Sequence, residues 1–233
     1  MPSFDIVKEV NPDETFRVNS IINNFDLDVK HIHEHFTGNI DIENIDWSVG
    51  LIVGGSGTGK STIAKQCFAD NYIKGYEYSA KSVIDDMPKD KSIKDIEKVF
   101  TSVGFARPPS WLKPYDVLSN GEKMRVDLAR SILEDKELIV FDEFTSVVNR
   151  EVAKTSSYAI SKAVRKQNKK FVAVACHRDI IEWLEPDWIY DTDEKHFFIV
   201  RERTTALKSN LKYTGLTMQL KSKYGRYLES ITI

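Results

Sequence analysis

The sequence predicts an α/β protein in which helices flank a mostly parallel β-sheet. Short apolar segments rich in β-branched residues alternate with longer segments whose apolar residues recur at helical spacing. Such alternation is typical of units in which a crossover helix joins two parallel strands and covers their sheet. A glycine-rich turn between an apolar strand and a helix (residues 54–61) and an acidic pair ending another apolar strand (residues 142–143) support the same class.

Strands and helices can be assigned along most of the chain. The predicted strands are short apolar runs bounded by turn residues, at 3–10, 39–55 (one or two strands), 81–88, 137–143, 169–179 and a hairpin over 188–203. The predicted helices have apolar residues at helical spacing, at 60–70, 92–105, 121–134 and 149–168. Residues 15–27 fit a strand or a helix, residues 180–188 a short helix or a turn, and residues 107–114 a loop. The hairpin adds a small antiparallel portion to the sheet.

Composition and charge are those of an ordinary globular chain. Its 233 residues can bury a substantial core in one domain with a small appendage. The net charge of −2 excludes polyanion binding by bulk charge alone. Residues 1–50 carry ten acidic and three basic side chains, whereas residues 201–233 carry seven basic and two acidic ones. This basic segment is either solvated surface or a contact for nucleic acid or an acidic protein.

Cysteine usage and hydropathy predict a cytoplasmic protein without direct membrane insertion. Cys67 and Cys176 lie far apart in apolar segments and form no metal-binding spacing, which fits a reducing compartment. No apolar run of the sequence approaches the roughly 18 residues that a membrane-spanning helix needs. The N-terminus, MPSFDIVKEV, lacks the basic start and apolar core of a signal peptide. A role at a membrane would therefore need another chain.

The segment VGLIVGGSGTGKST matches the phosphate-loop motif G-x-x-x-x-G-K-[ST] in its expected context between a strand and a helix. Its glycines let backbone N–H groups point at phosphate oxygens, and the helix that begins there favours negative charge. Lys60 places a charge on the terminal phosphates, and Ser61 offers a hydroxyl to Mg²⁺. The candidate nucleotide-binding residues here are Gly54, Gly55, Ser56, Gly57, Thr58, Gly59, Lys60, Ser61 and Thr62.

The predicted strand ELIVFDE ends in Asp142 and Glu143. A carboxylate at the carboxyl edge of a parallel sheet faces the crevice in which such sheets bind ligands. Asp142 can hold Mg²⁺ through water, because this ion keeps much of its hydration. Glu143 lies just past the strand, where a carboxylate can polarise an attacking water. Together with the phosphate loop, the pair predicts a magnesium-dependent site for a nucleoside triphosphate.

A polar stretch precedes the helix predicted over 121–134. Its residues are Leu118, Ser119, Asn120, Gly121 and Glu122, and a helix start with Ser119 as cap presents a hydroxyl and free N–H groups to an anion. This stretch resembles the Leu-Ser-Gly-Gly-Gln signature of the ATP-binding cassette (ABC) ATPase superfamily. The phosphate loop, the signature and the acidic strand also follow one another in the order of that family.

The resemblance covers about residues 15–195 and is nearest to small bacterial and phage-type ABC ATPases, some of which are associated with an acetyltransferase domain. It implies a head-to-tail homodimer that sandwiches ATP, with Ser119, Asn120 and Gly121 facing the γ-phosphate held by the other subunit. It also implies that Glu143 orients the attacking water.

Three further residues are assigned through the resemblance. Asn149 stands where the family usually has an aspartate in the segment that crosses the dimer interface, and we count it among the nucleotide-binding residues. In VAVACHRD, His177 is positioned to sense the γ-phosphate, so we group it with Lys60 and Glu143 as catalytic. The aromatic residue that stacks on adenine is best matched by Phe25, with Phe16 and Phe36 as rivals.

The sequence departs from the family's pattern in the signature and in the Q-loop. Asn120 and Glu122 replace the usual second glycine and the glutamine of the signature. No glutamine occurs in VIDDMPKD (residues 83–90), where we expect the Q-loop. Asp85 or Asp86 would then take over its contacts with metal and water, and we assign Asp86 to the metal with Ser61 and Asp142.

The short stretch between the phosphate loop and the signature implies a reduced helical subdomain at about residues 85–135. The ATPase domain would cover residues 1–195, and a basic extension would cover 196–233. In transporters of the family, this subdomain couples the ATPase to membrane subunits.

The sequence therefore predicts an ATP-hydrolysing enzyme that binds Mg²⁺, forms an ATP-sandwich dimer and is not a transporter. The dimer would pass its shape change to a nucleic acid or a protein partner. Two alternatives stay open: the ATP-binding subunit of a transporter with a separate membrane chain, and an ATP-gated dimerisation switch with little turnover. A small-molecule kinase is disfavoured, since neither a lid nor an acceptor pocket is recognisable.

Overall fold

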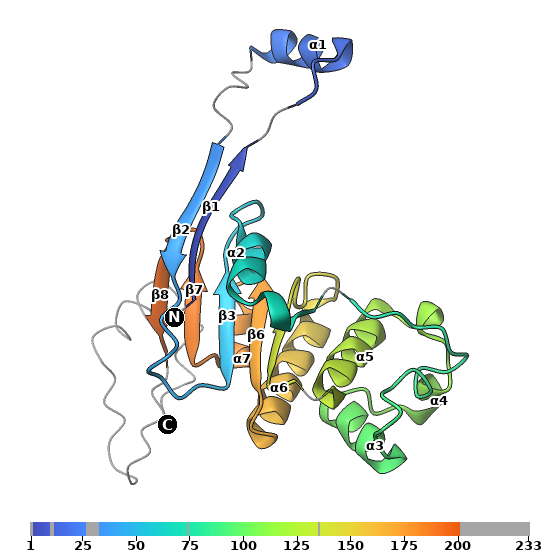
Figure 1. Cartoon of the computed structure of the whole chain (residues 1–233). Coiled ribbons are helices and arrows are strands. Elements are labelled where there is room, and N and C mark those ends of the chain that lie inside the picture. The colour runs from blue at the N-terminus through green and yellow to red at the C-terminus, as the bar shows by residue number, and fades with distance from the viewer. Residues whose placement is uncertain (1, 10–11, 27–32, 74, 135, 201–233) are drawn as a thin grey trace.

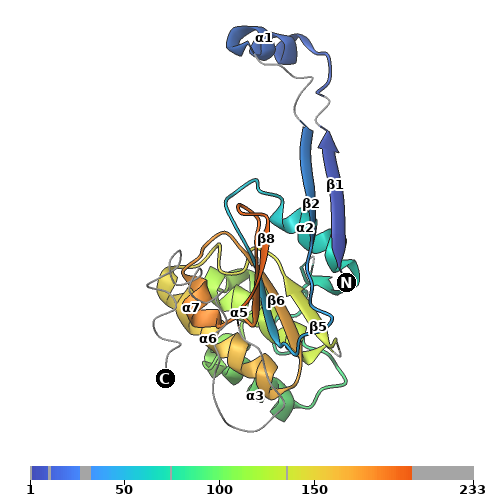
Figure 2. The same cartoon turned by 90° about the vertical axis from the view of Figure 1, so that its left-hand side faces the viewer.

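The computed structural model describes residues 2–9, 12–26, 33–73, 75–134 and 136–200. Within these ranges the chain forms a six-stranded sheet with helices on its faces, and a separate two-stranded hairpin beside it (Figures 1 and 2). The basic residues from 201 onward lie outside the described part of the chain.

The described ranges contain eight strands and seven α-helices. The strands are β1 (Ser3–Glu9), β2 (His33–Asn39), β3 (Val49–Val53), β4 (Tyr72–Ile73), β5 (Leu138–Phe141), β6 (Lys170–Ala175), β7 (Trp188–Asp191) and β8 (His196–Ile199). The helices are α1 (Phe16–Phe25), α2 (Lys60–Cys67), α3 (Ile93–Ser102), α4 (Pro108–Trp111), α5 (Asn120–Leu133), α6 (Arg150–Lys166) and α7 (Ile180–Leu184), with 3-10 turns at Ala69–Asn71 and Tyr115–Val117.

The sheet has the order β4-β5-β6-β3-β7-β8. All neighbours are parallel except β7 and β8, which pair antiparallel as the predicted hairpin. The central strand β3 is in register with β6 through Val49 opposite Phe171, and with β7 through Gly50 opposite Trp188. This confirms the predicted α/β class, and it places the carboxyl ends of five strands at one edge of the sheet.

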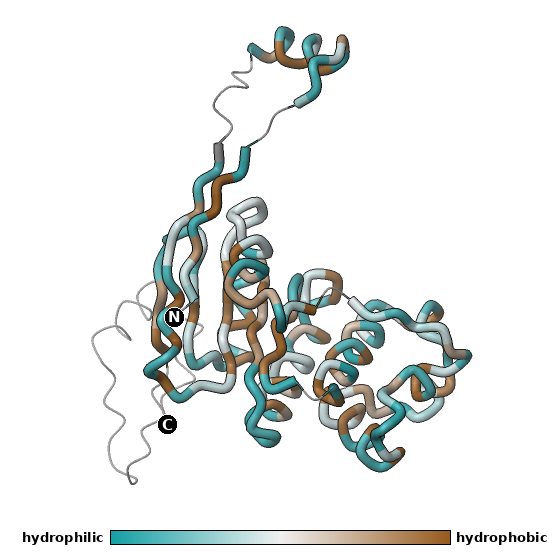
Figure 3. The backbone as a smooth tube through the Cα atoms, in the orientation of Figure 1, coloured by the Kyte–Doolittle hydropathy of each residue, from teal (hydrophilic) through white to brown (hydrophobic). Residues whose placement is uncertain are grey.

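Both faces of the sheet are buried, because alternate side chains of each strand point to opposite sides. On β3, Leu51 and Val53 belong to a core shared with α3, α5, α6 and α7. Ile52 belongs to a second core, which includes Ile63 of α2 and Phe4 of β1. Figure 3 shows hydrophobic residues following β3 and β6 through the middle of the molecule.

The helical part between the phosphate loop and β5 has its own apolar packing. Phe100 of α3 contacts Phe105 and Trp111 with ring centroids 5.2 and 5.5 Å apart, and the indole N–H of Trp111 donates to the Phe105 carbonyl at 2.7 Å. Helices α3, α4 and α5 lie together beside the β4 end of the sheet (Figure 1). The loop predicted at 107–114 contains the short helix α4.

Two predictions about the remaining segments are settled here. Residues 15–27 contain helix α1, capped by the Thr15 hydroxyl, which accepts from the Val18 N–H at 3.3 Å. The strand predicted at 81–88 is wrong, because this segment forms bends and turns. Its N–H groups at Val83 and Ile84 donate to carbonyls of the α4 region, and Val83 is buried in the helical core, so its apolar residues pack without joining a sheet.

Candidate functional site

The phosphate loop follows β3, so it begins in the middle of the sheet. Gly54 is packed so closely that a Cβ atom there would lie 2.0 Å from the Thr192 hydroxyl. Gly59 has a φ of +83°, which favours glycine, and a Cβ there would meet the Phe36 ring at 2.6 Å. Both glycines are therefore required by the packing as well as by the motif.

Helix α2 begins at Lys60, directly after the loop, and its first turn has no acidic residue. The preceding Gly59 has no side chain that could cap the N–H groups of this turn, so they are free to bind an anion with the favourable helix dipole. The Lys60 ammonium donates to the Gly55 carbonyl and therefore lies over the loop. The loop thus brings together backbone donors and a positive charge.

Asp142, at the end of β5, meets the phosphate loop. Its Oδ1 accepts from the Ser61 hydroxyl at 3.1 Å and from the Glu143 N–H at 2.9 Å. Its Oδ2 accepts from the hydroxyl of Tyr72, which lies on the neighbouring strand β4. Burial raises the pKa of Tyr72, and the contact with Asp142 adds to the rise, so this hydroxyl stays a donor.

The Ser61 and Asp142 oxygens suit Mg²⁺, which prefers one or two protein oxygens together with water and phosphate. Nowhere in the described ranges do three His, Cys, Asp or Glu side chains gather so that they could hold a metal ion by themselves. A magnesium ion at Ser61 and Asp142 would accordingly take its other ligands from water and a bound triphosphate.

Glu143 is exposed at the edge of the sheet, with a left-handed backbone (φ 51°) that turns the chain sharply after β5. A cavity of about 690 Å³ lies beside it, lined among others by Tyr72, Asn120, Lys123, Asp142 and Glu143. The acidic pair and the first residue of α5 therefore face the same space.

The predicted signature forms the start of α5, as expected of a helix cap. The Ser119 hydroxyl accepts from the Glu122 N–H at 3.4 Å, and the Glu122 carboxylate accepts from the Ser119 N–H at 3.0 Å, which makes a reciprocal capping box. The bond from the Ser119 N–H lowers the pKa of Glu122. This gives a physical reason for Glu122, while Gly121 packs so near α6 that a Cβ would lie 3.1 Å from Val152.

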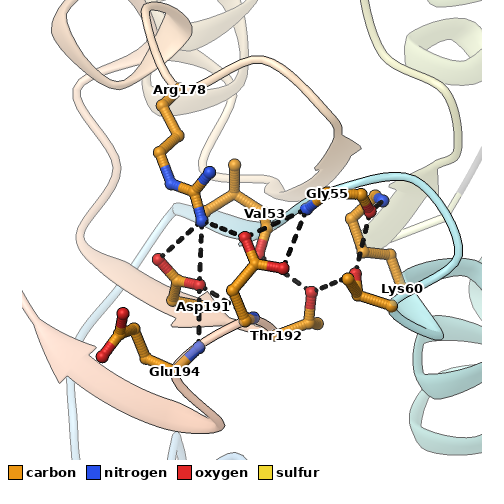
Figure 4. A network of polar contacts seen from close by, with 9 residues as sticks. Val53, Gly55, Lys60, Arg178, Asp191, Thr192 and Glu194 are labelled. Atoms are coloured by element: carbon orange, nitrogen blue, oxygen red, sulfur yellow. Dashed lines mark hydrogen bonds and ion pairs between the residues drawn. The ribbon is translucent and has the colours of Figure 1, made fainter.

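His177 follows β6 at the same edge of the sheet and is exposed. The next residue, Arg178, donates to both carboxylate oxygens of Asp191, at 3.1 and 3.2 Å, and to Asp193. Asp193 in turn accepts from the Gly55 N–H of the phosphate loop, at 3.1 Å to each oxygen (Figure 4). The bond from Arg178 lowers the pKa of Asp193, which therefore stays ionised.

The structure brings Phe36, and neither of the other two candidate aromatics, to the phosphate loop. Phe25 and Phe16 lie on α1, 68% and 86% exposed, and α1 lies beyond the far end of the β1–β2 hairpin (Figures 1 and 2). The Phe36 ring, in contrast, packs on Gly59. The assignment of the adenine-stacking residue to Phe25 has no support from this placement.

Asp86 and Asn149 have local roles in the structure. The Asp86 carboxylate accepts from the N–H groups of Ser79 and Ala80, at 3.1 Å each. Asp86 is not among the residues that line the cavity with Asp142, and β4 with Tyr72 occupies the place beside β5 instead. Asn149 caps α6, accepting from the Val152 N–H at 2.9 Å.

Sequence reasoning missed four residues that hold the site together: Tyr72, Arg178, Thr192 and Asp193. The two hydroxyl groups of Thr58 and Thr192 lie 2.6 Å apart, which joins the phosphate loop to the β7–β8 turn. The sequence did contain a signal for Thr192 and Asp193, because they follow the buried strand β7 just as Asp142 and Glu143 follow β5. Tyr72 had none, since the two-residue strand β4 is too short to be recognised.

Comparisons with known proteins agree with this architecture. No protein-family model matches the chain. It is 26% identical over 117 residues to the ABC multidrug transporter atrD of Emericella nidulans, and 39% identical over 67 residues to a putative ABC transporter ATP-binding protein of Clostridium perfringens. These matches cover 50% and 29% of this chain, and only 7% and 11% of the two relatives.

Among solved structures, the chain is similar to the ATP-binding cassette MJ0796, in a dimeric post-hydrolysis state bound to ADP and Pi. The TM-score is 0.55 at 14% identity, over 73% of this chain and 94% of that one. This likeness shows that the chain has the ATP-binding cassette fold. In the part of the chain that the structure describes, no helix combines the length and apolar character needed to cross a bilayer.

Proposed function

We propose, from the ATP-binding cassette fold that the chain has, that it binds and hydrolyses ATP. The observation that carries this proposal is the contact of Ser61 with Asp142 at 3.1 Å, which joins the phosphate loop to the acidic strand. A phosphate loop alone indicates a nucleotide, whereas this contact adds a carboxylate placed for the metal of a triphosphate. Glu143, the next residue, is exposed beside it and open to water.

Each residue has a physical task in this reaction. Lys60 and the N–H groups of α2 bind the phosphates, and Ser61 and Asp142 hold Mg²⁺, which neutralises charge on the phosphate oxygens. Glu143 orients the attacking water, and His177 approaches the γ-phosphate from the end of β6. Such catalysis consists largely of positioning and charge stabilisation.

The proposed assembly is a head-to-tail homodimer. Ser119, Asn120 and Gly121 stand at the exposed start of α5, where helix N–H groups can bind the γ-phosphate held by a second copy. The Ser119 hydroxyl donates to the Glu122 carboxylate at 2.9 Å and would turn from it to the phosphate. A cassette of the same fold is dimeric in its post-hydrolysis state. Phe36 is the aromatic residue that we assign to the adenine side, because its ring lies against Gly59.

What the dimer drives is proposed in two forms. A soluble ATPase that acts on a nucleic acid or a protein partner is supported by the compact helical part and by the basic residues of 201–233. The ATP-binding subunit of a transporter is supported by the names of the relatives. Recovery of the ATP-bound dimer with a membrane protein would favour the second, and salt-sensitive DNA or RNA binding the first.

The substitution Glu143→Gln tests the proposal. Without the carboxylate, hydrolysis should fall by about 100-fold or more while ATP still binds, so the protein should elute as a dimer in MgATP. The control is Glu182→Gln, on α7, which should hydrolyse ATP and stay monomeric at low concentration. A Glu143→Gln protein that hydrolyses ATP normally, or that is monomeric in saturating MgATP, contradicts the proposed mechanism. Normal turnover in the wild type also excludes a switch without hydrolysis.

A further inference from the structure

Gly55 of the phosphate loop is held through both of its backbone polar groups. The Gly55 N–H donates to both oxygens of Asp193, at 3.1 Å each. The Gly55 carbonyl accepts from the Thr58 hydroxyl at 2.9 Å and from the Lys60 ammonium. The position of Gly55, and with it the course of the loop, is therefore coupled to the β7–β8 turn that carries Asp193.

The turn that presents Asp193 is itself fixed. Asp191 is fully buried, and its Oδ1 accepts from the N–H groups of Asp193 and Glu194 at 3.0 and 3.2 Å. Asp193 is thus presented to the loop by backbone bonds as well as by its ion pair. In Figure 4 these groups form one connected network between the phosphate loop and Arg178.

Arg178 connects this network to His177, which we propose approaches the γ-phosphate, because Arg178 directly follows His177 in the chain. Its guanidinium binds Asp191 and Asp193 together, and 31% of its side chain is exposed. An arginine bound to two fixed carboxylates can hardly move without breaking charge-assisted bonds. The residue next to His177 is thereby anchored to the β7–β8 turn.

We infer that Arg178 and Asp193 are positioning residues that set the phosphate loop and His177 at a fixed distance from each other. The inference rests on the proposed function, because this distance matters for turnover only where a triphosphate lies between the two groups. Neither residue needs to touch the nucleotide. Arg178 acts through His177, and Asp193 acts through the N–H of Gly55.

A second arginine–aspartate pair offers a control on the same strand. Asp187, at the opposite end of β7, accepts from Arg165 at 2.9 and 3.0 Å and from the N–H groups of Ser48 and Val49. The pair has the same chemistry as the Arg178 network. It lies where β3 and β7 begin, at the edge of the sheet opposite the phosphate loop. Weakening this pair should lower stability without changing the reaction.

The experiment is a double-mutant cycle with Arg178→Ala, Asp193→Ala and the double variant, and with Arg178→Lys and Arg165→Lys beside them. For each folded protein, kcat for ATP, the affinity for ADP and the urea unfolding midpoint are measured. The single alanine variants should lose about 10- to 100-fold in kcat, because small displacements of a catalytic group have effects of that size.

Four results support the inference together. The double variant should be no slower than the worse single variant, because both break one connection. Arg178→Ala should bind ADP like the wild type, since ADP has no γ-phosphate and the Arg178 bonds that carry the inference are to Asp191 and Asp193. Arg178→Lys should restore part of kcat, and Arg165→Lys should lower only the unfolding midpoint.

Other results overturn it. Wild-type kcat in the alanine variants would reduce Arg178 and Asp193 to a structural role, and additive losses would show two independent effects. If the wild type does not hydrolyse ATP at all, the proposed function fails and the inference fails with it. This last outcome is recognised from the wild type alone, before any variant is compared.

Discussion

The hydroxyl of Tyr72 donates a hydrogen bond to Oδ2 of Asp142, so the carboxylate that ends β5 is held by the neighbouring strand as well as by the phosphate loop. Since β4 and β5 are parallel and in register, this contact fixes the rotamer of the carboxylate. A metal ligand that is fixed before binding loses less entropy when the ion arrives.

Removal of this hydroxyl should weaken magnesium binding. The variant Tyr72→Phe loses one hydrogen bond to a charged group, so the Mg²⁺ concentration for half-maximal ATP hydrolysis should rise about fivefold. The matched control is Tyr76→Phe, because Tyr76 lines the same cavity but its hydroxyl donates to Ser131 at 3.0 Å. An equal effect of both substitutions would contradict a specific role for Tyr72.

Ser119 should affect stability and dimerisation separately. Ser119→Ala breaks the capping box of α5 and should lower the free energy of unfolding by about 1 kcal/mol. Ser92→Ala, at the start of α3, loses a similar cap, where the hydroxyl accepts from the Asp95 N–H at 3.2 Å. In a Glu143→Gln background, gel filtration in MgATP should show fewer dimers for Ser119→Ala only. Equal dimer fractions would show that Ser119 caps α5 and has no role in dimerisation.

Substitution of Phe36 should weaken nucleotide binding, whereas substitution of Phe25 should not. Phe36→Ala removes the ring packed on Gly59, and loss of a base-stacking aromatic weakens binding by roughly 1–3 kcal/mol, so the ADP dissociation constant should rise about tenfold or more. Phe25→Ala, on the exposed face of α1, should leave it unchanged. Calorimetric titration with ADP measures both, and a selective effect of Phe25→Ala would restore the assignment made from the sequence.

Asp127 should make stability depend on pH in an unusual direction. It lies on α5 and accepts from the hydroxyls of Tyr78 and Tyr115 at 2.7 and 2.9 Å, and burial raises its pKa despite these bonds. The folded state therefore binds the proton more tightly than the unfolded chain. Its contribution to stability is complete below the ordinary aspartate pKa of about 4 and is lost as the pH rises through the raised value.

Urea unfolding of the wild type and of Asp127→Asn over a series of pH values tests this linkage. The difference in unfolding free energy should shift in favour of the asparagine variant as the pH increases, because asparagine carries no titrating proton. The control is Asp116→Asn, an exposed residue nearby. A wild-type advantage that is constant, or that grows with pH, would contradict the raised pKa.

Most of the fold could be predicted because its signals are local. The apolar run of β3, the glycines after it and the spacing of α2 lie within one stretch of chain, and so do the residues of the Ser119 capping box. The segment at 81–88 misled for a physical reason: its apolar residues are buried against helices, and apolar periodicity alone does not distinguish helix packing from strand pairing.

The rest of the site depends on contacts between distant segments. Strand β2 exists because it pairs with β1, across a helix that lies between them in the chain. Arg178 and Asp193 acquire their task only when β6 and β7 come to flank β3. Nothing in the residue types near Gly55 indicates that its N–H will be held by a carboxylate from the end of the sheet.

The strand order has a consequence for how the protein is made. Both neighbours of β3, Lys170–Ala175 and Trp188–Asp191, are translated long after β3 itself. Until they leave the ribosome, the apolar strand that leads into the phosphate loop has no partner on either edge, a condition that exposes nascent chains to aggregation and to chaperones. Truncated products of this chain should therefore be unable to capture nucleotide, however complete their motif.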